Sequence, residues 1–135
     1  MANGTIAFDT LQTSGQITGT AKSLDTDYVV TGSAKMWANV DQTGTQALVA
    51  NFGISSISDT GVGNTTLSYT NAMGSTAYVA TEMVGGGTGS TGDESFCCIP
   101  GTSLSTSSLP IRVRLDTGTA SDADIVCIVI TGDLA

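Results

Sequence analysis

The side chains that could do chemistry are few, and histidine is absent from all 135 residues. The chain therefore cannot form a Ser-His-Asp or Cys-His triad or a histidine zinc site, and it lacks the usual general base near neutral pH. A glycosidase needs two carboxylates, and Glu82 and Glu94 are the only glutamates. The alternation around Glu82 predicts the exposed face of a strand. Glu94 follows Asp93 in a glycine-rich stretch. We interpret both glutamates as solvated and expect no catalytic residue.

Two aspartate pairs and one glycine-rich stretch could bind ions or phosphate. Asp25 with Asp27, and Asp122 with Asp124, place carboxylates two residues apart. Calcium needs six to eight oxygen ligands, and neither pair has the further ligands of a calcium loop. Turn capping is the better interpretation. The stretch "GGGTGSTG" lacks the Lys-Ser/Thr ending of a phosphate-binding loop. We expect no metal and no cofactor.

Three cysteines offer thiol chemistry. Cys97 and Cys98 are adjacent, so their side chains point to opposite faces of a strand and are poorly placed to bond each other. Either could reach Cys127, and this alternative stays open. The N-terminus "MANGTIAFDT" lacks the basic start and apolar run of a signal peptide. We therefore expect reduced thiols that pack as small apolar groups.

The charge balance is strongly acidic, with a net charge of −8. The four cations, Lys22, Lys35, Arg112 and Arg114, cannot neutralise a phosphate backbone. Nucleic acid and anionic lipid are therefore disfavoured as partners. The longest apolar run, Ile125–Ile130, is far shorter than the roughly 18 residues of a membrane helix.

The large aromatic residues could bind sugars if they are exposed. Trp37, Tyr28, Tyr69 and Tyr78 each offer a ring face on which a sugar could stack. The alternative is that they pack in the core or at an interface, and we favour it.

Composition predicts an all-β chain, because 54 of the 135 residues are Thr, Ser or Gly. Threonine suits a pleated surface, whereas Gly and Ser supply turns. Ala34, Met36, Ala38 and Val40 alternate with Lys35, Trp37, Asn39 and Asp41, as expected for a half-buried strand. Ile111, Val113 and Leu115 also alternate and should face inward. The predicted strands are 28–32, 33–41, 45–53, 54–58, 65–70, 76–84, 95–99, 110–116 and 125–131.

Eight to ten short strands at this spacing predict a β-sandwich, jelly-roll-like, in a single domain at 28–135. An irregular N-terminal arm or a lead-in strand at 1–27 precedes it. The strand at 45–53 is apolar on both faces and should lie inside the sandwich. The strand at 125–131 should be central or lie at a subunit contact. A loop at 59–64 reverses the chain, and a flexible loop is expected at 85–94.

The sequence resembles a module of structural proteins of tailed bacteriophages, notably marine ones. The matching residues are Gly32-Ser33-Ala34-Lys35 with Trp37, "TGT" at Thr43–Thr45, the block "FGISSISDTGVGNTTLSYTNAM" from Phe52, and Tyr78 in "AYVAT". The resemblance covers about half the chain, and it implies a virion structural protein of the tail-fibre, adaptor or capsid-decoration type. The part after Val84 matches more weakly.

The resemblance implies a protein that is made in the host bacterial cytoplasm and resides in the virion. We expect a homo-oligomer, a trimer, that contacts copies of itself and other virion proteins. Candidate subunit contacts are Trp37, Ile125, Cys127, Val129 and Ile130. The alternative function is a carbohydrate- or receptor-binding adhesin tip that contacts a host surface glycan.

Overall fold

The computed structural model describes residues 32–87, 95–100 and 104–135 of the chain. The predicted arm at 1–27, and the strand expected from Tyr28 up to residue 31, lie outside the described residues.

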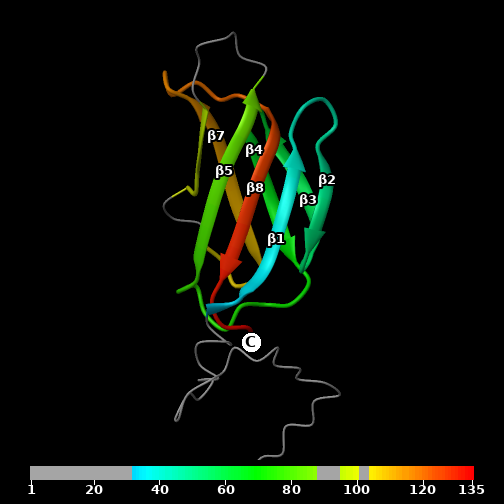
Figure 1. Cartoon of the computed structure of the whole chain (residues 1–135), viewed down its shortest axis with the longest axis vertical. Helices are drawn as coiled ribbons and strands as arrows, with labels where there is room; N and C mark the ends of the chain where they lie inside the picture. The colour runs from blue at the N-terminus through cyan, green and yellow to red at the C-terminus, as the bar shows by residue number, and fades with distance from the viewer. Residues whose placement is uncertain (1–31, 88–94, 101–103) are drawn as a thin grey trace, which may run out of the picture.

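The described part of the chain is nearly all β, as predicted. Its eight strands form two antiparallel sheets, sheet A in the order β2-β1-β8-β5 and sheet B in the order β3-β4-β7-β6. Figure 1 shows sheet A in front of strands β3, β4 and β7. The strands are β1 (Ala34–Asp41), β2 (Ala47–Phe52), β3 (Ile54–Gly61), β4 (Asn64–Tyr69), β5 (Val79–Gly87), β6 (Ser95–Cys98), β7 (Ser108–Leu115) and β8 (Ala123–Thr131).

Both sheets contribute to one hydrophobic core. The period of two in each strand turns alternate side chains to one side, and the apolar residues on that side are buried. Each fully buried aliphatic side chain contributes about 1.5–3 kcal/mol. The inward positions predicted at Ile111 and Val113 are confirmed, and Leu115 is half-buried. The core includes Met36, Ala38, Val40, Leu67, Tyr69, Leu109, Ile111, Val113, Val126, Ile128 and Ile130.

The chain passes from sheet A to sheet B at Gly53, between β2 and β3. Gly53 has a φ of 73°, in the left-handed region that favours glycine. A Cβ at this position would lie 2.9 Å from Met36 Cγ and 3.1 Å from the Lys35 carbonyl oxygen. The crossover therefore needs glycine both for its backbone conformation and for its close approach to β1.

Two predicted strands differ from the structure by three residues at an end, and the others within the described residues differ by two residues or fewer. The hairpin expected at 59–64 is tighter, because β3 continues to Gly61 and β4 begins at Asn64. The Gly63 N–H donates to Asp122 Oδ1 at 2.6 Å, which anchors this turn. The strand predicted at 76–84 begins at Val79 and continues to Gly87, because the first glycines of the expected flexible loop pair with β8.

Strand β2 corrects the prediction of an interior strand. It lies at the edge of sheet A, and Val49 and Phe52 are exposed. The prediction failed because apolar residues on both faces of a strand do not require its burial: among the residues of β2, only Leu48 is half-buried and packs against the core. Strand β8, by contrast, is central, between β1 and β5, as one of the two alternatives predicted.

Candidate functional site

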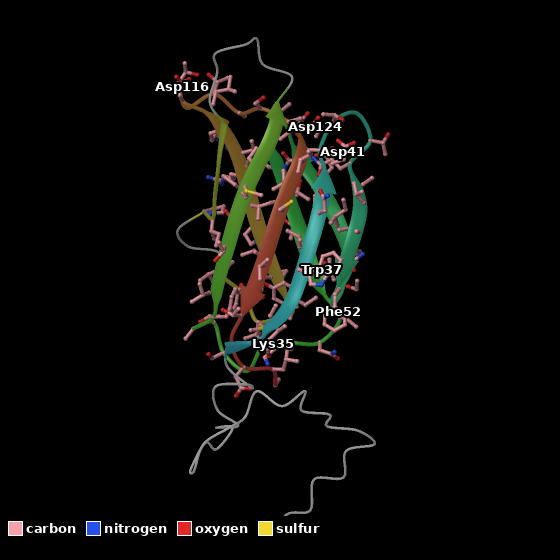
Figure 2. All side chains as sticks on the ribbon, in the orientation of Figure 1. Lys35, Trp37, Asp41, Phe52, Asp116 and Asp124 are labelled. Carbon is pink, nitrogen blue, oxygen red and sulfur yellow. The ribbon has the colours of Figure 1, made fainter. Side chains whose placement is uncertain are left out.

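The outer face of sheet A carries a group of exposed apolar side chains. Trp37 on β1 lies opposite Phe52 on β2 and opposite Val129 on β8, so the three share one row across the sheet. Figure 2 shows Trp37 and Phe52 close together on neighbouring strands. The rest of the face includes the exposed Ile125 and Met83 and the half-buried Cys127. We call these six residues the outer apolar face.

The exposure of this face is substantial for large apolar residues. Trp37 is 41% exposed and Met83 is 66% exposed. Scattered exposed apolar residues are ordinary, but a contiguous patch marks an interaction surface. The row from Phe52 to Val129 and the neighbouring β8 and β5 residues make this patch contiguous.

Four of the five predicted contact residues lie on the outer apolar face. They are Trp37, Ile125, Cys127 and Val129. Ile130 is a correction, because it is 0% exposed and belongs to the core. Successive residues of a strand point to opposite faces, so Val129 and Ile130 cannot both reach the same surface.

The sequence prediction missed Phe52 and Met83. Phe52 was assigned to an interior strand, and the apolar positions of β5 were not separated by face. The signal in the sequence was the alternation along this strand. Val79, Thr81 and Met83 face outward, and Ala80 and Glu82 face inward.

Glu82 corrects the prediction that its side chain lies on the exposed face of a strand. Its Cα pairs with that of Ile128, whose side chain is in the core, so Glu82 lies on the inner side of the sheet. Burial raises the pKa of the half-buried Glu82 carboxyl, and a hydrogen bond with the Cys97 thiol lowers it in part. Glu82 Oε1 is buried and has no hydrogen-bond partner within the described residues.

The edges of sheet A are poorly suited to pairing with another strand. An inward-pointing charge on an edge strand disfavours edge-to-edge growth, and Glu82 places one on β5. Strand β2, at the other edge, has an irregular register with β1 between Asn39 and Val40. A bulged edge is likewise a poor template. Association through the face of sheet A is therefore favoured over association through its edges.

The charges near the outer apolar face lie at its two ends (Figure 2). Lys35 is at one end of β1, whereas Asp41 and Asp124 are at the opposite end. The Thr43 hydroxyl and backbone N–H both donate to Asp41 Oδ1, at 2.6 and 2.8 Å. Both bonds hold the pKa of Asp41 below its ordinary value, and the bond from the Thr43 hydroxyl has the larger effect. The Asp41 charge is thus fixed at the turn.

A small crevice adjoins the outer apolar face near Lys35. It has a volume of about 190 Å³, and its lining includes Phe52, Met36, Gly53 and Leu134. Such a crevice can receive one apolar side chain, and filled pockets of this kind are where interface energy concentrates.

The outer face of sheet B has the opposite chemistry. A hollow of about 440 Å³ is lined there by Thr60, Asn64, Pro100, Pro110, Ile111, Arg112 and Arg114. Arg114 donates from Nη1 to the Val113 carbonyl at 2.8 Å and from Nη2 to Asn64 Oδ1 at 3.2 Å. The hollow on sheet B therefore combines cationic and polar groups with apolar walls, whereas the outer apolar face of sheet A has its charges only at its two ends.

The tyrosines do not offer ring faces to a ligand. Tyr69 and Tyr78 are buried, with ring centroids 6.1 Å apart in an edge arrangement and hydroxyls 3.0 Å apart. Burial and then the Tyr78 hydroxyl raise the pKa of Tyr69. The core interpretation is confirmed for both, and a sugar cannot stack on Tyr78. Tyr28 lies outside the described residues.

The remaining candidates for chemistry are not brought together. Asp122 caps the Gly63 turn, and Asp25, Asp27 and Glu94 lie outside the described residues. The Cys97 thiol is hydrogen-bonded with Glu82, Cys127 is a free thiol, and the side chain of Cys98 is not described. Within residues 32–87, 95–100 and 104–135, no three His, Cys, Asp or Glu side chains are grouped to hold a metal. No helix of the described part is long and apolar enough to cross a membrane.

Comparisons with protein-family models, with curated proteins and with solved structures gave no match.

Proposed function

We propose that this chain is a structural subunit of a bacteriophage particle, a jelly-roll-like β-sandwich that assembles with copies of itself through the outer apolar face of sheet A. The phage assignment comes from the sequence resemblance. The contiguous row of Phe52, Trp37 and Val129 supports assembly through the face. In the particle, the subunit serves as a tail-fibre, adaptor or capsid-decoration module that binds other virion proteins, and it has no catalytic role.

The shared core of the two sheets supports the β-sandwich assignment. Eight strands in two antiparallel sheets match the strand number of a jelly roll. The first and last strands, β1 and β8, lie side by side at the centre of sheet A, so the sheet closes only when the whole domain has folded.

A second copy is the partner that fits the face best. The centre of the face is uncharged, whereas Lys35 lies at one end and Asp41 and Asp124 at the other. A copy turned end over end would bring each lysine to the acidic end of its partner. Such complementarity fixes the orientation of an interface, while apolar burial supplies its affinity.

The number of copies in the assembly can be measured as a molar mass in solution. The end-over-end arrangement pairs two chains, whereas the resemblance predicts three. Three copies stays a prediction, and the molar mass in solution separates the two assemblies from a 13.6 kDa monomer.

Light scattering on Met83→Glu tests the interface. Met83 is exposed in the single chain, so glutamate should not disturb the fold, but it would bury an unpaired carboxylate between copies. We expect the native chain to be an oligomer and the variant to have the monomer mass. The matched control is Val62→Glu, because Val62 is 59% exposed at the β3–β4 turn and lies away from the face. A native monomer, or equal effects of both variants, would contradict the proposed interface.

A map of the assembled particle tests the phage assignment. We expect density for the two sheets at a tail or capsid position, with the outer apolar face buried. Particles that contain no copy of the chain would refute the assignment even if the purified chain is an oligomer.

A further inference from the structure

The two arginines of β7 define a site on the outer face of sheet B. Arg112 and Arg114 are two residues apart on one strand, so their side chains leave the same face about 7 Å apart. They are two of only four cations in a chain with a net charge of −8. No carboxylate belongs to the described lining of the adjoining hollow. In this acidic molecule, the hollow is a local concentration of positive charge.

The two guanidinium groups have different roles. Arg114 is held by its bonds to the Val113 carbonyl and to Asn64 Oδ1. Asn64 is itself fixed, because its Nδ2 donates to the Val62 carbonyl at 2.9 Å. Arg112 lies opposite Asn64 in the register and is exposed, with no hydrogen-bond or ion-pair partner among the described residues. One arginine is thus anchored and the other is available.

We propose that this hollow binds a saccharide that carries a single carboxylate. The planar guanidinium of Arg112 can hold a carboxylate through two parallel N–H···O bonds. Thr60 and Asn64 supply hydroxyl and amide groups for sugar hydroxyls. Pro100 and Pro110 supply rigid apolar walls.

The size and charge of the site favour this ligand class. A volume of about 440 Å³ is in the range of small-molecule sites and exceeds what an inorganic anion needs. The net charge of −8 opposes a ligand with many negative charges, such as a nucleic acid. A monoacidic sugar combines one ionic contact with several neutral hydrogen bonds.

This inference is independent of the proposed assembly, because it concerns the other sheet. The ligand class agrees with the alternative function of glycan binding. Here the arginines bind the sugar, and Tyr78 does not stack on it because Tyr78 is buried.

Calorimetric or NMR titration of the full chain with methyl galacturonoside tests the site. The methyl ester of the same sugar removes only the charge, and inorganic phosphate supplies only the charge. We expect saturable binding of the acid, and binding of the ester and of phosphate weaker by roughly tenfold or more. An ester that binds as tightly as the acid would overturn the role of the carboxylate. Phosphate that binds as tightly would overturn the saccharide assignment.

The variant Arg112→Gln should weaken binding of the acid by roughly tenfold, because it removes the bidentate contact. Arg112→Lys should rescue only part of the loss, since lysine keeps the charge but not the planar fork. Lys35→Gln is the matched control, because it removes one positive charge from the opposite side of the molecule. No binding to the native chain, or equal losses in Arg112→Gln and Lys35→Gln, would overturn the proposal. Arg112→Gln should keep the native molar mass, because Arg112 lies on sheet B and the proposed assembly uses sheet A, and this separates the sugar site from the assembly.

Discussion

Thr65 is a buried hydroxyl that holds two glutamine side chains. It accepts a hydrogen bond from Gln42 Nε2 at 2.9 Å and donates to Gln46 Oε1 at 2.6 Å. Gln42 also receives the Ala123 N–H at its Oε1, at 3.3 Å. This network joins the end of β1 to β4 and to the start of β8, so it ties the two sheets together with polar contacts in an otherwise apolar interior.

The substitution Thr65→Val tests this network. Valine has nearly the same shape but leaves the Nε2 of Gln42, a residue that is almost fully buried, without its acceptor. We expect the free energy of unfolding, measured in urea, to fall by about 1–3 kcal/mol. Thr66→Val is the control, since Thr66 points to the other face of β4, and it should change stability by less than about 0.5 kcal/mol. Equal effects of the two variants would show that the network is not stabilising.

Glu82 links stability to pH. Its pKa is raised in the folded chain chiefly by burial, so the folded state favours the protonated carboxyl. The associated stability is fully present below its ordinary pKa of 4.5 and is lost as pH rises through the raised value. The ionised carboxyl therefore destabilises the fold near neutral pH.

We expect Glu82→Gln to be more stable than the native chain at pH 7, by ~0.5–1 kcal/mol once solvent access to the half-buried carboxyl is taken into account. The difference should vanish below pH 4.5. Thermal unfolding at several pH values measures it, with the exposed Asp116→Asn as the control (Figure 2). A Gln variant that is less stable at pH 7 would mean that ionised Glu82 is favourably held in the fold.

At the scale of elements, alternation located the strands better than it oriented them. The faces of β1 and β7 were predictable, because aliphatic residues or alanine recur at every second position from Met36 to Val40 and from Ile111 to Val113. The faces of β5 were not, because Glu82 points inward while Met83 points outward. On an outward face that contacts a partner, apolar residues occupy positions that are usually polar. A single sequence does not distinguish such a face from one that packs in the core.

The candidate sites were predictable to different degrees. Ile125, Cys127 and Val129 lie in the apolar run that predicts a central or contact strand, and Trp37 lies on the strand predicted at 33–41. The Arg112–Arg114 hollow was not predictable, because Asn64, Thr60 and Pro100 reach it from segments that only the strand pairing brings together.

The crossover from β2 to β3 depends on Gly53, and Gly53→Ala tests it. The added methyl group would meet Met36 and the Lys35 carbonyl, in addition to the strain of a positive φ. We expect a loss of about 2–3 kcal/mol in urea unfolding. Gly44→Ala separates the two causes, because Gly44 also has a positive φ of 61° but a Cβ there meets nothing within 4 Å. It should cost only about 1 kcal/mol. Equal losses would mean that strain alone, and not close packing against β1, requires glycine at the crossover.

At the scale of the whole molecule, the two outer faces divide the chemistry between them. Sheet A exposes aromatic and aliphatic side chains, with Lys35 and Asp41 at opposite ends. Sheet B exposes hydroxyl, amide and guanidinium groups. A subunit with one face for its copies and one face for a ligand can present that ligand site on the outside of an assembly.

The central claim is that another copy of the chain covers the outer apolar face. Trp37 reports on this directly, because it is the one tryptophan of the sequence and lies between Phe52 and Val129 in a row of the face. Met83 is on β5, separated from Trp37 by β8, so Met83→Glu leaves the immediate neighbours of the indole unchanged.

The measurement is quenching of Trp37 fluorescence by acrylamide, compared among the native chain, Met83→Glu and Val62→Glu at one concentration. Coverage by a second copy predicts slow quenching in the native chain and in Val62→Glu, and fast quenching in Met83→Glu. Equally fast quenching in all three, at the level expected for an indole that is 41% exposed, would contradict the claim.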